Sequence, residues 1–431
     1  MADTEVGAFP DADRSGRAVL AGTLAAAMAA SMLPLFIVGS LGIFVIGDLH
    51  ISRSALGGLV SITFGTAAIL STYSGQLVDL IGGRSALVVL FTMVAVDFVL
   101  MSLATTYAWL LGAFALGGAA QSLANPATNK LISQLLLPKR RAVVVGVKQS
   151  GVQFGALLAG LVLPTLSAGV GWRMAVRAAM ILPLLGLLLV FAKIPSSRVS
   201  VRRGRLVRPA LPEAPVRWLM GYSFFMAAGA SGMNSYLALY AHQAVGLTPG
   251  RAGFVLAAVG VAGAFSRIFW SGMGDRMRHA STALVIVSAV AVASALLVCA
   301  AASAGSALLW AGAIGLGGSA VAAFALSMVV LLMGSRLGTA GHDSAMVSLG
   351  VFAGFVVGAP LFGMLVDSTG GYIAAWLSVA AEFAVAGGVA VAWRGAGSGS
   401  APLDARGGPE PGTPALEHSR SIGRFTEPGT S

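Results

Sequence analysis

The sequence is poor in charge. Asp, Glu, Lys and Arg make up only 10% of its 431 residues, whereas hydrophobic residues make up 57% and the mean hydropathy is +0.86. So few charged residues cannot cover the surface of a soluble globule, and so many apolar residues cannot be buried in one core. We therefore expect lipid to be the solvent for most of the chain.

Residues for metal, redox and nucleotide chemistry are also scarce. The single cysteine, Cys299, excludes a disulfide within one chain and a cysteine-based metal site, and the five histidines show no ligand spacing. No Gly-x-x-x-x-Gly-Lys-(Ser/Thr) loop occurs, which argues against a pump that hydrolyses ATP. No nucleic-acid motif accompanies the net charge of +11. We expect no metal, no cofactor, no nucleic-acid partner and no enzymatic activity.

What the sequence does contain is twelve long apolar segments. Segments of about 20 residues can cross the hydrocarbon core of a bilayer, and in lipid they must be helices because the backbone has to satisfy its own hydrogen bonds. The predicted fold class is an all-α membrane protein with twelve transmembrane helices. The segments are Val19–Ile46, Ala55–Val78, Ala86–Thr105, Trp109–Leu137, Ala142–Leu166, Met174–Ala192, Trp218–Tyr240, Ala252–Met273, Thr282–Ala302, Ala307–Met333, Ser344–Val366 and Tyr372–Trp393.

The distribution of Lys and Arg predicts the orientation. Twelve crossings place both termini on one side, and if that side is cytoplasmic, 20 basic residues lie inside, 4 outside and 3 within the membrane. This asymmetry is typical of the positive-inside rule. The first segment has no cleavage site and should remain as an anchor. We expect an integral protein of the inner (plasma) membrane with both termini cytoplasmic.

Changes in composition divide the chain into five regions. A basic, proline-rich stretch separates two blocks of six segments, and the last residues are rich in Gly, Ser and Pro, which is typical of disorder. The regions are an N-terminal cytoplasmic tail (1–17), a six-helix bundle (18–195), a cytoplasmic linker (196–216), a second six-helix bundle (217–394) and a disordered cytoplasmic tail (395–431).

The two blocks are similar to each other. The second and eighth segments both end in a short polar turn, with Asp79 and Asp275 196 positions apart. The fifth and eleventh carry glycines at four-residue spacing, starting at Gly151 and Gly350, which are 199 positions apart. Two such pairs predict a parallel repeat, hence two pseudo-symmetric bundles. The small residues predict surfaces on which the two halves pivot.

The first polar turn resembles the loop signature of the major facilitator superfamily, Gly-x-x-x-Asp-(Arg/Lys)-x-Gly-Arg. Gly75, Asp79 and Arg84 match it, with Leu80 where a basic residue is usual, and the likeness covers about residues 18 to 394. The resemblance implies the major facilitator fold and transport by alternating access. It also implies that Asp79 and Arg84 form the inner gate together with Asp275 and Arg276 of the second copy, which has Ser271 in place of the glycine.

In the resembled family, Asp79 would cap the amino end of the eleventh helix when the inner gate is closed, and Asp275 would cap the fifth. A carboxylate beside a helix amino terminus is stabilised by the partial positive charge there. The alternative is that these residues only tighten a solvated turn.

Two cations inside the membrane occur in one half only. The repeat places Ser71 opposite Arg267 and Val347 opposite Lys148. On helical projection both cations lie on glycine-lined faces, where a cavity or a neighbouring helix must sit. A guanidinium binds a carboxylate in bidentate fashion and an ammonium supplies a point charge, so the pair favours an organic anion.

Arg267 on the eighth helix is also similar to the arginine of monocarboxylate and oxalate transporters in this superfamily. The stretch from Lys148 to Gly151, and that around Asn125, resemble the cyanate-permease-like branch. Two alternatives stay open: Arg267 pairs with a carbonyl or an Asp near the inner gate, and Lys148 extends to the cytoplasm.

Further polar residues complete the predicted pocket. Gln121, Asn125 and Thr128 form a polar stripe on the fourth helix, whereas Lys130 projects away from it and is expected to extend towards the cytoplasm. The seventh helix offers Asn234, Tyr236 and Tyr240, and the alternative is that these groups belong to an interfacial belt.

Proton coupling needs a group that titrates. Asp97 and Glu382 are the carboxylates within the apolar segments, and for each the alternative is a structural hydrogen bond or an oligomer contact. Coupling is therefore an open prediction.

The predicted function is secondary transport of a small organic anion, as a monomer in the bilayer, with a proton as a possible co-substrate. The alternatives are efflux of lipophilic drug-like compounds and a non-transporting membrane sensor on the same scaffold. The fifth helix argues against drug efflux, because it lacks the Gly-Pro-rich signature of drug/proton antiporters and has no proline before Pro164.

Overall fold

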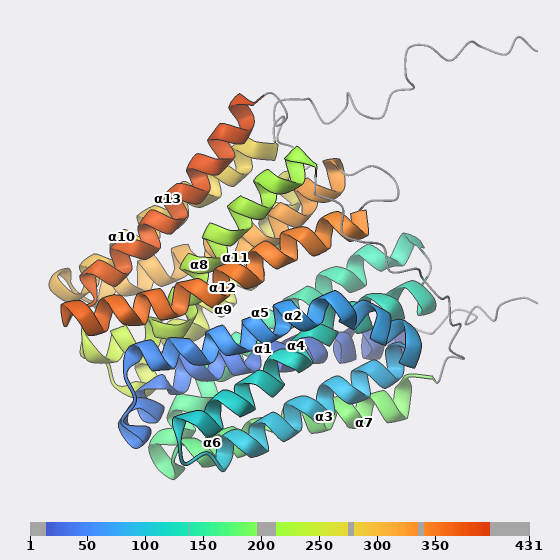
Figure 1. The fold of residues 1–431 in the computed structure, drawn as a ribbon, viewed down its shortest axis with the longest axis horizontal. Helices are drawn as coiled ribbons and strands as arrows, with labels where there is room; N and C mark the ends of the chain where they lie inside the picture. The colour runs from blue at the N-terminus through green and yellow to red at the C-terminus, as the bar shows by residue number, and fades with distance from the viewer. Residues whose placement is uncertain (1–13, 137, 196–212, 275–279, 335–339, 397–431) are drawn as a thin grey trace, which may run out of the picture.

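The computed structural model describes residues 14–136, 138–195, 213–274, 280–334 and 340–396, and in these ranges the chain forms thirteen α-helices and no strands (Figure 1). Most of the predicted linker and of the two tails lies outside the described residues, as do Asp275 and Arg276. The first seven helices are α1 (Arg14–Leu49), α2 (Arg53–Ile81), α3 (Gly83–Ser102), α4 (Tyr107–Leu135), α5 (Pro138–Val170), α6 (Trp172–Ala179) and α7 (Ile181–Lys193). The other six are α8 (Ala214–Gln243), α9 (Pro249–Gly274), α10 (Ala280–Ala304), α11 (Ser306–Gly334), α12 (Ala340–Thr369) and α13 (Ile373–Gly395).

The sixth predicted segment is interrupted. Helix α6 ends at Ala179 and α7 begins at Ile181 because Pro183 has no N–H to donate to the carbonyl of Ala179 and its ring crowds the preceding turn. The two pieces form one crossing, so the fold has the twelve predicted crossings. Ten crossings of the described chain are long and apolar enough to span a membrane on composition alone. Helices α4 and α8 have the length, 29 and 30 residues, but carry more polar side chains.

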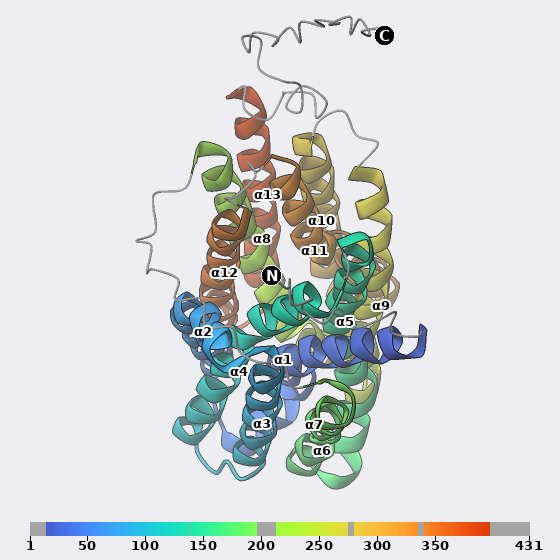
Figure 2. The ribbon, with the colours of Figure 1, turned by 90° about the vertical axis from the view of Figure 1, so that its right-hand side faces the viewer.

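The crossings form two bundles, α1–α7 and α8–α13, which lie side by side when viewed along the helices (Figure 2). We call the face where α1 begins and α13 ends the terminal face, and the other the far face. Short turns hold the helices in place at both: Ser52 caps α2 by accepting the N–H of Ala55, and Gly82 and Gly171 adopt positive φ angles of 85° and 84° between helices.

The repeated glycines pack helices within each bundle. Gly151 of α5 touches the carbonyl of Ala25 in α1, and at Gly350 of α12 an added Cβ would lie 2.6 Å from the carbonyl of Met220 in α8. These stripes are equivalent, as the repeat predicts, but they do not lie between the halves as expected. The contacts between the halves on α5 are made by other residues, as where Gln153 lies against Gly263 of α9 and Gly160 against Gly253.

The two bundles touch mainly in their far half. Helices α2 and α12 run antiparallel there: Gly57 packs on Ala359, and the Ser61 hydroxyl donates to the carbonyl of Val356 at 2.5 Å. Towards the terminal face the bundles diverge (Figure 1), and the last three turns of α2 are exposed on most sides, as at Tyr73 (62%). The structure is therefore closed at the far face and open at the terminal face.

Candidate functional site

The ammonium of Lys148 lies in the interior of the first bundle. The residue is only 1% exposed, and its Nζ donates to Asn125 Oδ1 (3.1 Å), Thr128 Oγ1 (3.0 Å) and Asn129 Oδ1 (2.6 Å) of α4. Among the described residues no carboxylate lies within ion-pairing distance of it. Lys148 therefore points sideways to α4 and does not extend to the terminal face in this conformation.

The acceptors of Lys148 are the polar stripe of α4. Asn125 and Asn129 are exposed, so the ammonium lies one side chain away from open space, whereas Gln121 is buried and its Oε1 has no partner among the described residues. The sequence predicted the stripe at Gln121, Asn125 and Thr128 but missed Asn129. Pro126 lies inside this helix, and residues beyond a proline are poorly placed by regular projection.

Arg267 reaches across the interface between the halves. Its Nη1 donates to the carbonyl of Gln149 on α5 at 2.8 Å, and Gln149 is the residue after Lys148. Arg267 of the second bundle therefore binds α5 at the residue next to Lys148. The carbonyl contact is one of the alternatives that the sequence left open.

The two predicted residues of α8 are placed differently. The Asn234 amide donates to the carbonyl of Ala230 in its own helix at 2.7 Å, and its backbone carbonyl lies against Gly39 of α1. Tyr236 is fully buried; its hydroxyl donates to the carbonyl of Arg53 and its ring stacks on Phe362. Tyr236 thus lies with the far-face contacts and is not brought together with Lys148.

The far face is held by a carboxylate on a helix amino terminus. Asp367, in the last turn of α12, accepts the N–H groups of Arg53 (3.3 Å) and Ser54 (2.8 Å) in the first turn of α2. The Arg53 guanidinium lies 3.7 Å from the same carboxylate and donates to Gln243 of α8 at 2.9 Å. The free N–H groups and the dipole of a helix start both favour an anion. Sequence reasoning missed this cluster of Asp367, Arg53 and Gln243, which we call the far-face clamp.

At the open terminal face Asp79 pairs with a cation of its own bundle. Its carboxylate lies 2.8 Å from the ammonium of Lys130 on α4, which also donates to the carbonyl of Val78. The prediction that Lys130 extends towards the cytoplasm rather than binding substrate stays a prediction. In the structure α2 passes close enough for Asp79 to bind the Lys130 ammonium near the terminal face. The family signature usually has a basic residue after Asp79, where this chain has Leu80. Lys130 of α4 provides a cation for Asp79 instead. Arg84 donates to the carbonyl of Phe191 at 3.4 Å within the first bundle.

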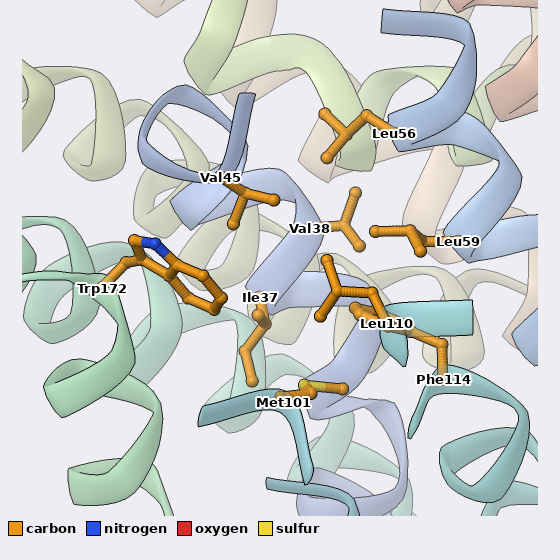
Figure 3. A pocket seen from close by; sticks show the side chains of 9 residues that line it. All are labelled: Ile37, Val38, Val45, Leu56, Leu59, Met101, Leu110, Phe114 and Trp172. Carbon is orange, nitrogen blue, oxygen red and sulfur yellow. The ribbon is translucent and has the colours of Figure 1, made fainter. Parts of the chain in front are cut away.

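The two predicted proton carriers are both within bundles. Asp97 of α3 is fully buried, and Glu382 of α13 has one buried oxygen without a partner among the described residues. Close to the level of Asp97, towards the far face, the first bundle encloses a small apolar cavity (Figure 3). Its lining is Ile37, Val38, Val45, Leu56, Leu59, Met101, Leu110, Phe114 and Trp172.

Residues 19–341 match the sequence profile of the Major Facilitator Superfamily, and the chain therefore belongs to this superfamily. The chain is a transporter built on the major facilitator fold. No curated protein sequence matches it.

Two solved structures share its fold. One is the nucleoside transporter NupG (D323A mutant), with a TM-score of 0.70 and 13% identity over 86% of this chain and 99% of that one. The other is a bacterial homolog to the human lysosomal transporter Spinster in an inward-facing and occupied conformation, with a TM-score of 0.69 and 14% identity over 90% and 98%.

Proposed function

We propose that the protein transports a small organic anion with a carboxylate group by alternating access. The observation that supports this is Lys148, a buried cation whose described partners are all neutral amide and hydroxyl oxygens. A buried cation without a counter-ion in a membrane protein is costly, and such residues mark pathways for ions and substrates.

A carboxylate would complete this site. It would replace Asn125 or Asn129 as acceptor and form a charge-assisted hydrogen bond, which is roughly twice as strong as one with a neutral partner. Arg267 binds the residue next to Lys148, and we propose that its guanidinium leaves the Gln149 carbonyl to bind the same anion. One anionic group would then be bound by two cations, Lys148 from the first half and Arg267 from the second.

The opposite faces would be closed by the same pair of helices. Along the antiparallel contact of α2 and α12, Ser61 lies opposite Val356. Asp79 lies 18 residues after Ser61 on α2. The position 18 residues before Val356 on the antiparallel α12 is within two residues of Ala340, where α12 begins, so Asp79 and the start of α12 are at the same level. Asp79 is therefore in register to leave Lys130 and cap α12 when the terminal face closes, as Asp367 caps α2 in the clamp.

We further propose that the terminal face is cytoplasmic, in the inner membrane, and that the monomer is described here in its inward-open state. The 20-to-4 distribution of basic residues supports this orientation. The five regions inferred from composition remain our division of the chain, with the inner gate completed by Asp275 and Arg276.

The test is equilibrium binding to the purified protein across carboxylates, nucleosides, sugars and lipophilic cations, followed by uptake of the bound compound into proteoliposomes. Selective binding and uptake of carboxylates is the expected result. Binding without uptake would favour a sensor, and selective handling of lipophilic cations would favour drug efflux.

Replacing Arg267 by lysine should reduce carboxylate uptake by about tenfold, because the charge remains but the bidentate fork is lost. The measurement is initial uptake rate in proteoliposomes, with Arg251→Lys, an exposed arginine at the far face, as the matched control. Wild-type uptake with intact specificity in Arg267→Lys would refute its role as a ligand.

Replacing Asp367 by asparagine should open the far face more often, by about fivefold, because the helix start loses its anion while the side-chain shape is kept. A cysteine at Ser61 in a Cys299→Ala background, labelled from the far face with an impermeant maleimide, measures this opening. Ser368→Ala removes a neighbouring hydroxyl that bonds only its own helix and should leave the labelling rate unchanged. Equal labelling rates in the Asp367 and Ser368 variants would show that the clamp does not hold the far face closed.

A further inference from the structure

Asp97 lies where α1, α3 and α4 meet. An added Cβ at Gly117 of α4 would lie 2.6 Å from Asp97 Oδ2 and 3.2 Å from Pro34 of α1, so the carboxyl group occupies the space that this glycine leaves. Both carboxyl oxygens are buried and have no partner among the described residues. Pro34, which has no N–H, also leaves the Ala30 carbonyl of α1 without its helical donor.

An ionised carboxylate in this position would be unpaired. The helices packed against α3 are α1, α2, α4, α6 and α7, and their described charged groups bind elsewhere or lie near helix ends. Arg177 of α6 is the nearest along α3, and it donates to Ser102, five residues beyond Asp97. The remaining groups are Asp48, Arg53, Asp79, Lys130, Arg173 and Lys193, with Arg84 on α3 itself. Burial of an unpaired charge costs far more than burial of a neutral acid, and this favours the protonated form of Asp97 in this conformation.

A polar route leads from Asp97 in one direction. One turn along α4 from Gly117 lies Gln121, whose Oε1 is buried and without a described partner, and one further turn brings Asn125, which is exposed and binds Lys148. In the other direction the next turn of each helix contributes Ile37, Met101 and Phe114 to the apolar cavity in Figure 3. The polar side chains next to Asp97 therefore lie on the side of Lys148.

We propose that Asp97 is the proton-binding site of this transporter and that its proton is linked to the charge at Lys148, so that one proton crosses with each monovalent carboxylate. This inference rests on the proposed anion site. The proton binds to a carboxylate oxygen of Asp97 and leaves from the same oxygen. Because one proton crosses with one monoanion, the transport cycle moves no net charge.

The link between the two sites is electrostatic. Lys148 binds α4 between eight and twelve residues beyond Gly117, which corresponds to about 15 Å along the helix at 1.5 Å per residue. At this distance, with an effective dielectric constant near 20, the Lys148 charge favours the ionised form of Asp97 by about sixfold. A bound carboxylate cancels this charge, so anion binding promotes proton binding.

The test needs no substrate. The full-length protein, labelled with ¹³C-aspartate and reconstituted in proteoliposomes, is titrated with pH alone, and the infrared band of protonated aspartate is recorded. The wild type should show a protonated aspartate at neutral pH, and Asp97→Asn, which keeps the shape of the side chain, should lose that band. In Lys148→Gln the band should persist to a pH about 0.8 units higher, which is the sixfold effect expressed as a proton equilibrium.

Two controls separate charge from folding. Lys148→Arg keeps the charge and should retain the wild-type midpoint, and Lys193→Gln removes an exposed cation at the terminal end of α7 and should not move it. A band that survives in Asp97→Asn, or an unchanged midpoint in Lys148→Gln, overturns the inference. The carboxylate binding panel fails or succeeds independently, so the anion site and the proton site are tested separately.

Discussion

Replacing Lys148 by methionine is expected to lower the affinity for carboxylates by about 100-fold, because an anion in this buried site would lose its charged partner. Methionine keeps the length and apolar stem of lysine, so packing between α4 and α5 is preserved. The measurement is equilibrium binding of the carboxylates that the wild type selects.

The matched control for this change is Lys193→Met, which removes a cation exposed at the end of α7. Its affinity should equal that of the wild type. If Lys148→Met binds carboxylates as tightly as Lys193→Met does, the anion site lies elsewhere.

Replacing Gly57 by valine is expected to force the far face open, raising the labelling of a cysteine at Ser61 by about tenfold through overpacking of the contact. An added Cβ at Gly57 would lie 2.6 Å from the backbone carbonyl of Ala359 and 2.7 Å from the nitrogen of Pro360. Backbone atoms cannot turn away as a flexible side chain can, so α2 and α12 must separate.

Gly112→Val is the control for this substitution. It adds the same side chain to a membrane helix, α4, at a position with no atom within 4 Å of the new Cβ. Labelling should stay at the wild-type rate there. Equal labelling in the two variants would mean that the α2–α12 contact does not close the far face.

The twelve crossings could be predicted from sequence because each depends only on local composition. The repeat also follows from residues that the sequence displays directly, Asp79 with Asp275 and Gly151 with Gly350. The break at Pro183 was missed because a single proline inside an apolar run changes the helix without changing its hydropathy.

The candidate site could be predicted in part. Lys148 and the α4 stripe were selected because charged and amide side chains in an apolar segment are conspicuous. The pairing of Lys130 with Asp79 could not be predicted, because it depends on how closely α2 passes α4. The clamp of Asp367 on Arg53 joins residues 314 positions apart, so no local pattern encodes it.

Helices α2 and α12 each place an aspartate two residues before their last residue, Asp79 before Ile81 and Asp367 before Thr369. Because the two helices are antiparallel, the carboxylate at the end of one lies beside the start of the other. Asp367 caps the start of α2 in this structure, and we propose that Asp79 caps the start of α12 when the terminal face is closed. If the two helices rock against each other as rigid bodies, as we propose, both pairs of ends cannot meet at once. Such a mechanism makes a continuous aqueous pore geometrically unfavourable, and it would protect the ion gradients of the cell while solute is moved.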